Sequence, residues 1–155
     1  FEEGEEKICP CCGNKSRVYY TSMPYCIDNV DYLCPTCISN GDAARKFDAM
    51  FVSDAEWHGD NDKEKDDELF RRTPGYLSWQ GEHWLSCCDD YCAYMGTVGT
   101  RELKAMDIAD EVISEYEERD EFADVEEYLV KDGPMCGYLF KCLHCGKYHL
   151  YVDAD

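Results

Sequence analysis

The stretch Cys9-Pro10-Cys11-Cys12-Gly13, followed 21 residues later by Cys34-Pro35-Thr36-Cys37, decides how the first part of this chain folds. Two cysteines three positions apart on a tight turn direct both sulfurs at one ion, and four such sulfurs form the closed tetrahedral site of structural zinc. A glycine after the second cysteine supplies the backbone freedom that the turn needs. We therefore predict a zinc-ribbon-like module with four ligands: Cys9, Cys12, Cys34 and Cys37.

A second cysteine pair of the same spacing lies near the C-terminus, in Cys142-Leu143-His144-Cys145-Gly146. Its partners are expected near position 90, where the spacing is less regular and two pairings remain open, Cys88-x3-Cys92 and Cys87-x4-Cys92. We prefer the first pairing, because its shorter loop is nearer to the geometry of a zinc knuckle. The predicted ligands of a second zinc ion are Cys88, Cys92, Cys142 and Cys145.

The cysteine content favours metal over disulfides. There are 12 cysteines, and most of them fall in close pairs rather than singly. Such pairs indicate metal sites and a reducing compartment, so we expect a cytoplasmic protein. No apolar run approaches 18 residues, and no membrane span is expected. Two sites with four sulfurs each leave no open coordination position, which predicts structural metal and no enzymatic activity. Cys11 can replace a neighbour, so its role stays open.

The formal net charge of −19 bears on the class of partner. A surface this negative repels phosphate backbones, so a nucleic acid is not expected to bind. A basic protein partner is expected instead. Residues 102–127 hold twelve acidic residues against two basic ones, which favours such a partner. The residues that we expect to contact such a partner are Glu115, Glu118, Glu121, Trp79 and Trp84. For the two tryptophans, the alternative is a filler of the core between the zinc modules.

Hydrophobic periodicity predicts an α+β fold. Apolar positions at helical spacing predict helices from about residue 39 to 51, over 100–118 and over 122–129, whereas 16–21 and 30–33 are typical of strands. Residues 54–68 read as a solvated acidic loop and 79–84 as a short helix. The segments 138–141 and 148–152 predict a hairpin around Cys142 and Cys145. We expect a single compact domain with a first zinc module at 8–53, a second at 69–155, and a helical insertion at 100–131.

Several segments resemble the bacterial CbrC family, an uncharacterised group named for a colicin-tolerance protein. The segments that carry this resemblance are Cys9–Gly13, Tyr32–Ile38, Asn40–Phe47, Arg72–Gln80, His83–Leu85, Cys88 with Cys92, and Phe140–Gly146. Position 87 departs from the family, which often has a histidine there. The resemblance implies a link to tolerance of bacterial toxins and no reaction.

Three functions follow as hypotheses. The first is a non-enzymatic, immunity-like interaction protein that binds a basic toxin domain through its acidic face. The second is a zinc-ribbon module that regulates or accompanies nucleic acid, which requires a basic surface patch. The third is a metal-dependent enzyme, which requires a zinc ion with a missing protein ligand. The oligomeric state stays open.

Overall fold

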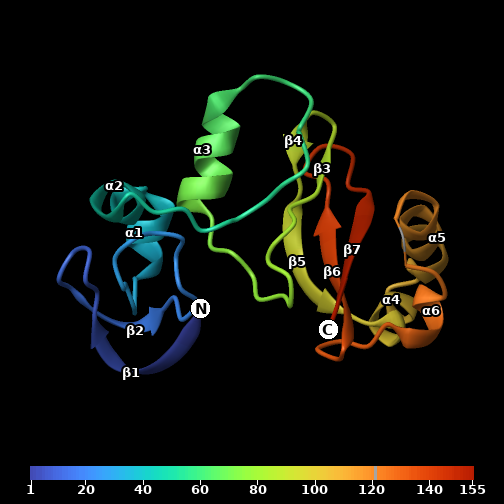
Figure 1. Cartoon of the computed structure of the whole chain (residues 1–155), viewed down its shortest axis with the longest axis horizontal. Coiled ribbons are helices and arrows are strands. Elements are labelled where there is room, and N and C mark those ends of the chain that lie inside the picture. The colour runs from blue at the N-terminus through green and yellow to red at the C-terminus, as the bar shows by residue number, and fades with distance from the viewer. Residues whose placement is uncertain (121) are drawn as a thin grey trace. The chain divides into compact units, whose positions relative to one another are not determined.

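A computed structural model describes residues 1–120 and 122–155. Helices alternate with small antiparallel sheets (Figure 1), which confirms the predicted α+β class. The chain divides into two compact units. The first comprises residues 1–55 and 61–77, and the second residues 56–60 and 78–155. Whether the chain acts as a single domain, with modules at 8–53 and 69–155, stays a prediction.

The first unit begins with a two-stranded ribbon. Strand β1 (Glu2–Ile8) pairs antiparallel with β2 (Lys15–Tyr19), and the turn between them carries the first cysteine pair. The segment 30–33, which we expected to be a strand, contributes a single bridge between Leu33 and Tyr20. That bridge brings the chain back to β2 just before the second cysteine pair.

Three short helices complete the first unit: α1 (Pro35–Ser39), α2 (Asp42–Phe47) and α3 (Lys63–Arg72). The prediction of one helix from 39 to 51 is wrong, because Gly41 (φ 81°) and Asp48 (φ 47°) adopt left-handed backbone angles that interrupt it. The prediction of a loop over 54–68 is wrong in its second half. The Asp62 carboxylate there accepts a hydrogen bond from the Glu64 amide at 2.9 Å and caps α3.

The core of the first unit contains the cysteines themselves. Its buried cluster consists of Cys9, Tyr20, Val30, Leu33, Cys34, Cys37, Ile38, Ala43, Ala44 and Phe51. Tyr20 and Phe51 meet edge to face with ring centroids 5.6 Å apart. This is a small apolar cluster, and three of its members carry a sulfur that a metal can bind.

The second unit is built on a three-stranded sheet. Its strands β5 (Ala93–Val98), β6 (Met135–Lys141) and β7 (Tyr148–Ala154) lie in that spatial order, and all are antiparallel. Strands β6 and β7 form the predicted C-terminal hairpin in continuous register from Met135–Ala154 to Lys141–Tyr148. A separate small hairpin, β3 (Ser86–Cys87) with β4 (Asp90–Tyr91), precedes β5.

The predicted helical insertion between β5 and β6 is present as α4 (Thr100–Ala105), α5 (Ala109–Arg119) and α6 (Val125–Tyr128). Asp107, with φ 59°, separates α4 from α5, so one continuous helix over 100–118 does not form. The helices bury an apolar cluster against the sheet: Val98, Leu103, Ala109, Val112, Ile113, Tyr116, Val125, Leu129, Leu139, Leu150 and Val152.

Aromatic rings form a further packed group in the second unit. Phe140 is fully buried and contacts Trp84 and Tyr94, with ring centroids 5.4 and 5.5 Å away. The expected short helix over 79–84 does not form; the segment is irregular up to a bridge at Trp84. Among the described residues, no helix combines the length and the apolar character that a membrane crossing requires.

Candidate metal centres

The structure gathers eight of the twelve cysteines into two groups of four. Within each group the sulfur atoms all lie within 4.8 Å of one another. The first group is Cys9, Cys12, Cys34 and Cys37, the four residues that the sequence predicts. The second is Cys87, Cys88, Cys142 and Cys145. Four sulfurs at this spacing fit a soft metal ion in tetrahedral coordination.

The first half of the first centre is a knuckle between β1 and β2. The amide of Gly13 donates to the carbonyl of Cys9 at 2.8 Å, and the amide of Cys9 donates to the carbonyl of Asn14 at 2.8 Å. Gly13 has φ 75°, a left-handed angle that a side chain would strain. These bonds close the turn and hold the sulfurs of Cys9 and Cys12 on one side.

The second half of this centre lies at the start of α1. Cys34 occupies the N-cap position, Pro35 begins the helix, and Cys37 follows one turn later. The amide of Cys34 donates to the Cys9 sulfur at 3.4 Å, and the sulfurs of Cys12 and Cys34 are 3.9 Å apart. Residues 22 and 25 positions apart in sequence are thereby joined around one point.

The second centre repeats the knuckle at the turn between β6 and β7. The amide of Gly146 donates to the carbonyl of Cys142 at 3.1 Å, and the amide of Cys142 donates to the carbonyl of Lys147 at 2.9 Å. Gly146 has φ 74°, matching Gly13. The amides of His144 and Cys145 both donate to the Cys142 sulfur at 3.4 Å. This is the same local device, built from C-x2-C-G in both places.

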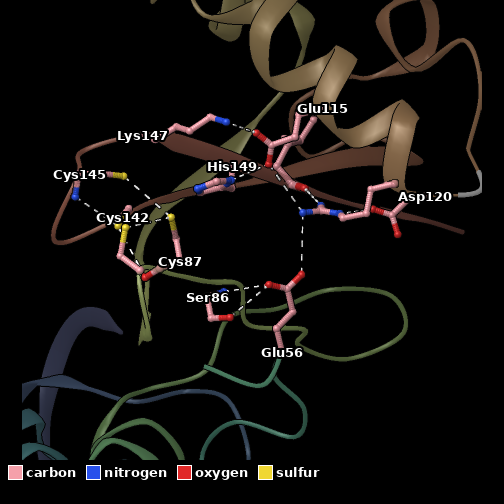
Figure 2. Close-up of polar contacts among 12 residues, drawn as sticks. Glu56, Ser86, Cys87, Glu115, Asp120, Cys142, Cys145, Lys147 and His149 are labelled. Carbon is pink, nitrogen blue, oxygen red and sulfur yellow. Dashed lines mark hydrogen bonds and ion pairs between the residues drawn. The ribbon is translucent and has the colours of Figure 1, made fainter. Parts of the chain in front are cut away.

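The opposite half of the second centre is the β3–β4 hairpin, not a second knuckle. Cys88 and Asp89 form its two-residue turn with φ 53° and 57°, as hairpin turns of this length require. Cys87 ends β3, and its sulfur lies 3.8 Å from that of Cys88 and 3.9 Å from that of Cys145. Figure 2 shows Cys87 facing Cys142 and Cys145 of the C-terminal hairpin.

Cys92 is not part of this group, which corrects the expected pairing of Cys88 with Cys92. The turn at Cys88–Asp89 reverses the chain, so Cys92 lies three residues along the returning strand, about 10 Å from the turn. Its amide donates to the carbonyl of Leu85 at 3.0 Å, and its carbonyl accepts from the Trp84 indole at 2.8 Å. Cys92 is buried, and burial raises the pKa of its thiol to about 12. It is a core thiol.

One cysteine in each centre has a lowered thiol pKa. Burial raises the pKa of Cys9, but hydrogen bonds from the backbone of Cys34, Cys12 and Cys11 outweigh it and leave the pKa at about 7. Burial likewise opposes ionisation of Cys142, and the amides of Cys145 and His144 lower its pKa to about 6. Amides aimed at a sulfur stabilise the thiolate, which is the form that binds metal.

The two centres differ in exposure. In the first, Cys9, Cys34 and Cys37 are buried and only Cys12 is exposed. In the second, Cys142 alone is buried, whereas Cys88 and Cys145 are exposed and Cys87 is intermediate. An exposed thiolate site is more open to chelators and oxidants. We therefore expect the second centre to lose its metal first.

Three further cysteines lie outside both groups. Cys11 is half-buried, and its sulfur is hydrogen-bonded with that of Cys37, next to the first centre. The Cys26 thiol donates to the carbonyl of Asp28 at 3.1 Å. Cys136 is buried and accepts a hydrogen bond from the Asp132 amide at 3.3 Å. Cys11 is thus a fifth sulfur beside a complete set of four.

The residues expected to contact a partner separate into distinct environments. Trp84 is buried, 4% exposed, and belongs to the aromatic group around Phe140, so it is core filler and not a contact residue. Trp79 is 59% exposed. Glu118 is exposed on α5, whereas Glu115 is half-buried and bonded within the unit. Glu121 lies outside the described residues.

Comparison with known proteins extends these observations. The model of the uncharacterised protein family UPF0167 matches residues 1–154. UPF0167 proteins of Mycobacterium bovis and Mycobacterium tuberculosis are each 36% identical over 157 residues, covering 96% of this chain and 83% of the relative. One from Pseudomonas aeruginosa is 35% identical over 166 residues, covering 97% and 88%.

No solved structure matches the chain. The narrower resemblance to the CbrC family stays a prediction. The match nearly from end to end, together with relatives above 30% identity over most of both chains, shows that this chain belongs to the uncharacterised protein family UPF0167.

Proposed function

We propose that this protein is a non-enzymatic interaction protein whose two units are each held together by one structural zinc ion, and that its acidic surface binds a basic protein partner. The observation that carries the metal assignment is the pair of four-sulfur groups, each with all sulfurs within 4.8 Å. Thiolates favour zinc among the common divalent ions, and four of them complete its coordination without water. A complete sulfur set also supports a structural role over catalysis.

The metal assignment is tested by metal analysis and X-ray absorption on reduced, purified protein. We expect two zinc ions per chain, each surrounded by four sulfurs. Cys9→Ser is expected to remove one ion, whereas Cys26→Ser, which changes a cysteine outside both groups, is expected to leave both. One ion, or a light atom in place of a sulfur, would contradict the structural assignment and return attention to a metal-dependent enzyme.

The partner assignment is supported by charge and by a hollow on the second unit. The formal charge is −19, and a groove of about 580 Å³ among α4, α5 and α6 is lined by five carboxylates. Its lining residues are Lys104, Ala109, Asp110, Ile113, Ser114, Glu117, Asp124, Glu126 and Glu127. Lys104 is paired with Glu126 at 2.7 Å, so one base is already neutralised. Complementary charge of this kind speeds association and selects basic partners.

The partner assignment is tested with a fluorescent lysine- and arginine-rich peptide and then with a basic nuclease toxin domain. Asp110→Lys and Glu127→Lys in the groove, combined with Glu118→Lys at an exposed position of α5, are expected to weaken binding at low salt by at least about tenfold. The control, Glu2→Lys, Glu3→Lys and Glu5→Lys on β1, changes the net charge equally but at exposed residues of the first unit. Equal weakening by both sets would mean that only net charge matters, and the groove would lose its role.

A further inference from the structure

A buried histidine lies beside the second metal centre without being one of its four sulfur ligands. His149 on β7 is 8% exposed. Its Nδ1 lies 2.6 Å from Oε1 of Glu115 on α5, whereas its Nε2 is buried and has no hydrogen-bond partner among the described residues. A buried nitrogen left in this way calls for a partner, because an unsatisfied polar atom is costly in a protein interior.

The register of the hairpin places this ring on the cysteine side of the sheet. His149 pairs with Phe140 across the strands, and Cys142 pairs with Lys147 at the turn. Directly opposed residues, and residues two apart on one strand, share a face, so Cys142, Lys147 and His149 lie on the same face. Figure 2 shows the ring of His149 between Glu115 on one side and the labelled cysteines on the other.

Glu115 fixes the direction of the ring. Its second oxygen, Oε2, forms an ion pair with Nζ of Lys147 at 2.9 Å, so the two oxygens face groups at and just before the start of β7. Burial raises the pKa of Glu115, but the hydrogen bonds from His149 and Lys147 outweigh it and hold the pKa below its usual value. The carboxylate is therefore ionised and accepts a hydrogen bond from Nδ1–H of the ring. Nε2, on the other side of the ring, points away from Glu115.

The negative charge of a metal-bound second centre gives a reason for a hydrogen-bond donor at Nε2. Four thiolates around a divalent ion carry a net charge of about −2, and donors to the sulfurs offset it. Cys142 already accepts from two amides. The β3 sulfur of Cys87 has no such pair of amides among the described contacts. A ring N–H directed at this side of the cluster would complete the set of donors.

We propose that His149 is a positioning residue of the second metal centre: as an imidazolium between two anionic groups, it donates Nδ1–H to the Glu115 carboxylate and Nε2–H to a metal-bound thiolate. This inference rests on the proposed metal binding. It adds a histidine donor to the second centre; among the described residues, the ligand group and the hydrogen bonds of the first centre include no histidine. His149 donates on both nitrogens and does not coordinate the ion.

The test uses the full chain loaded with NMR-active cadmium and isotopically labelled histidine. We expect two cadmium signals, one of which couples weakly to the Nε2 proton of His149 through the hydrogen bond. Two signals without this coupling would overturn the inference and leave metal binding intact. A large one-bond coupling between cadmium and Nε2 would make His149 a ligand, which also overturns the donor role. A single cadmium signal that lacks this coupling would contradict the proposed pair of metal centres and the inference together.

Variants supply a second readout through chelator competition at both centres. His149→Phe, which keeps a ring but has no donor, is expected to weaken metal binding at the second centre by about 10- to 100-fold and to leave the first unchanged. His149→Gln is expected to recover part of the loss, because its amide places an N–H at similar reach. A loss shared equally by both variants would indicate packing and not hydrogen bonding.

His144→Phe is the matched control. His144 belongs to the same knuckle, but its side chain is 55% exposed and its Nε2 lies 2.9 Å from the Asp90 carboxylate. We expect less than about a threefold change in metal affinity, since an exposed ion pair of this kind contributes little. An effect as large as that of His149→Phe would remove the specific role assigned to His149.

Discussion

The choice among neighbouring cysteines is made by backbone angles at two residues. Cys88 and Asp89 both adopt left-handed angles, and this turn places Cys87 and Cys88 at the centre while Cys92 returns into the core. Sequence spacing favoured Cys92, because three intervening residues resemble a knuckle more than adjacent cysteines do. Adjacent cysteines serve here because a tight hairpin separates their side chains.

Replacing Cys87 and Cys92 in turn distinguishes a ligand from a core thiol. Cys87→Ser is expected to weaken metal binding at the second centre by more than the roughly 10- to 100-fold that outer-shell changes cause. Cys92→Ser is expected to leave two ions bound and to lower the free energy of unfolding by about 1–3 kcal/mol, because it buries a hydroxyl. Chelator competition and denaturant unfolding measure the two effects. A lost ion in the Cys92 variant alone would reverse the assignment.

Metal affinity is expected to rise with pH. Protons compete with metal for sulfur, and the pKa values of about 7 for Cys9 and about 6 for Cys142 leave one sulfur per centre ionised in mildly basic solution. Burial raises the pKa of Cys37 and Cys87, so these sulfurs must lose protons when metal binds. We expect roughly three protons released per ion at pH 8 and about four at pH 5.5. Titration calorimetry in buffers of different ionisation enthalpy measures this; release that does not depend on pH would contradict it.

Among the helices and strands, α5 is joined to the edge of the sheet by Arg119. Its guanidinium donates to the carbonyl of Leu150 on β7 at 2.9 Å and lies 3.8 Å from the carboxylate of Glu56, which in turn accepts from the amide of Ser86 at 3.0 Å. Figure 2 shows the carboxylate of Glu56 beside Ser86. Because β7 is an edge strand, its outer carbonyls need such partners.

Arg119→Met tests this connection while keeping an unbranched apolar stem. The Arg119 side chain is 36% exposed, so we discount the hydrogen bonds for solvent and expect a loss of about 1 kcal/mol in the free energy of unfolding. Arg101→Met on α4 makes the same chemical change at an exposed position and is expected to stay within about 0.5 kcal/mol. Denaturant unfolding compares them, and equal losses would show that Arg119 does not tie the helix to the strand.

For the whole chain, the two units are expected to depend on metal to different extents. The buried cluster of the first unit includes Cys9, Cys34 and Cys37, three of its own ligands. In the second unit, the described members of the cluster that joins three helices to the sheet include no cysteine, and the buried Cys92, Cys136 and Cys142 lie outside it. Small domains with a thin apolar core rely on metal for stability, so the first unit has less to hold it after metal is lost.

Hydrogen exchange after chelation checks this difference. We expect the amide of Tyr20, bonded to the Leu33 carbonyl at 2.9 Å, to lose its protection. Amides of β6 and β7, such as those of the opposed residues Phe140 and His149, are expected to keep most of theirs. Metal release is expected in the opposite order to this loss of protection, because the more exposed second centre loses its ion first. Equal loss of protection in both units would show that apolar burial is not enough to keep the second unit folded without its metal.

Short stretches of sequence determine the local features of this protein, namely its knuckles, its hairpin and its helices. C-x2-C-G predicted both knuckles, because turn geometry and amide-to-sulfur bonds depend on about five adjacent residues. The segments 138–141 and 148–152 around Cys142 and Cys145 predicted the β6–β7 hairpin, and helical spacing predicted an insertion near 100–131. The breaks at Gly41, Asp48 and Asp107 were missed, since a left-handed residue inside an apolar pattern leaves its spacing intact.

Features that join distant segments required the folded chain. The spacing of cysteines could not choose among positions 87, 88 and 92, because a hairpin turn and core packing around Trp84 made that choice. Nothing near His149 in sequence indicates Glu115, which is 34 positions away and arrives on α5. Glu115 looked like a free surface acid for the same reason. Short-range bonding depends on neighbours in the chain, whereas partners across a sheet edge depend on where the apolar faces of the helices pack.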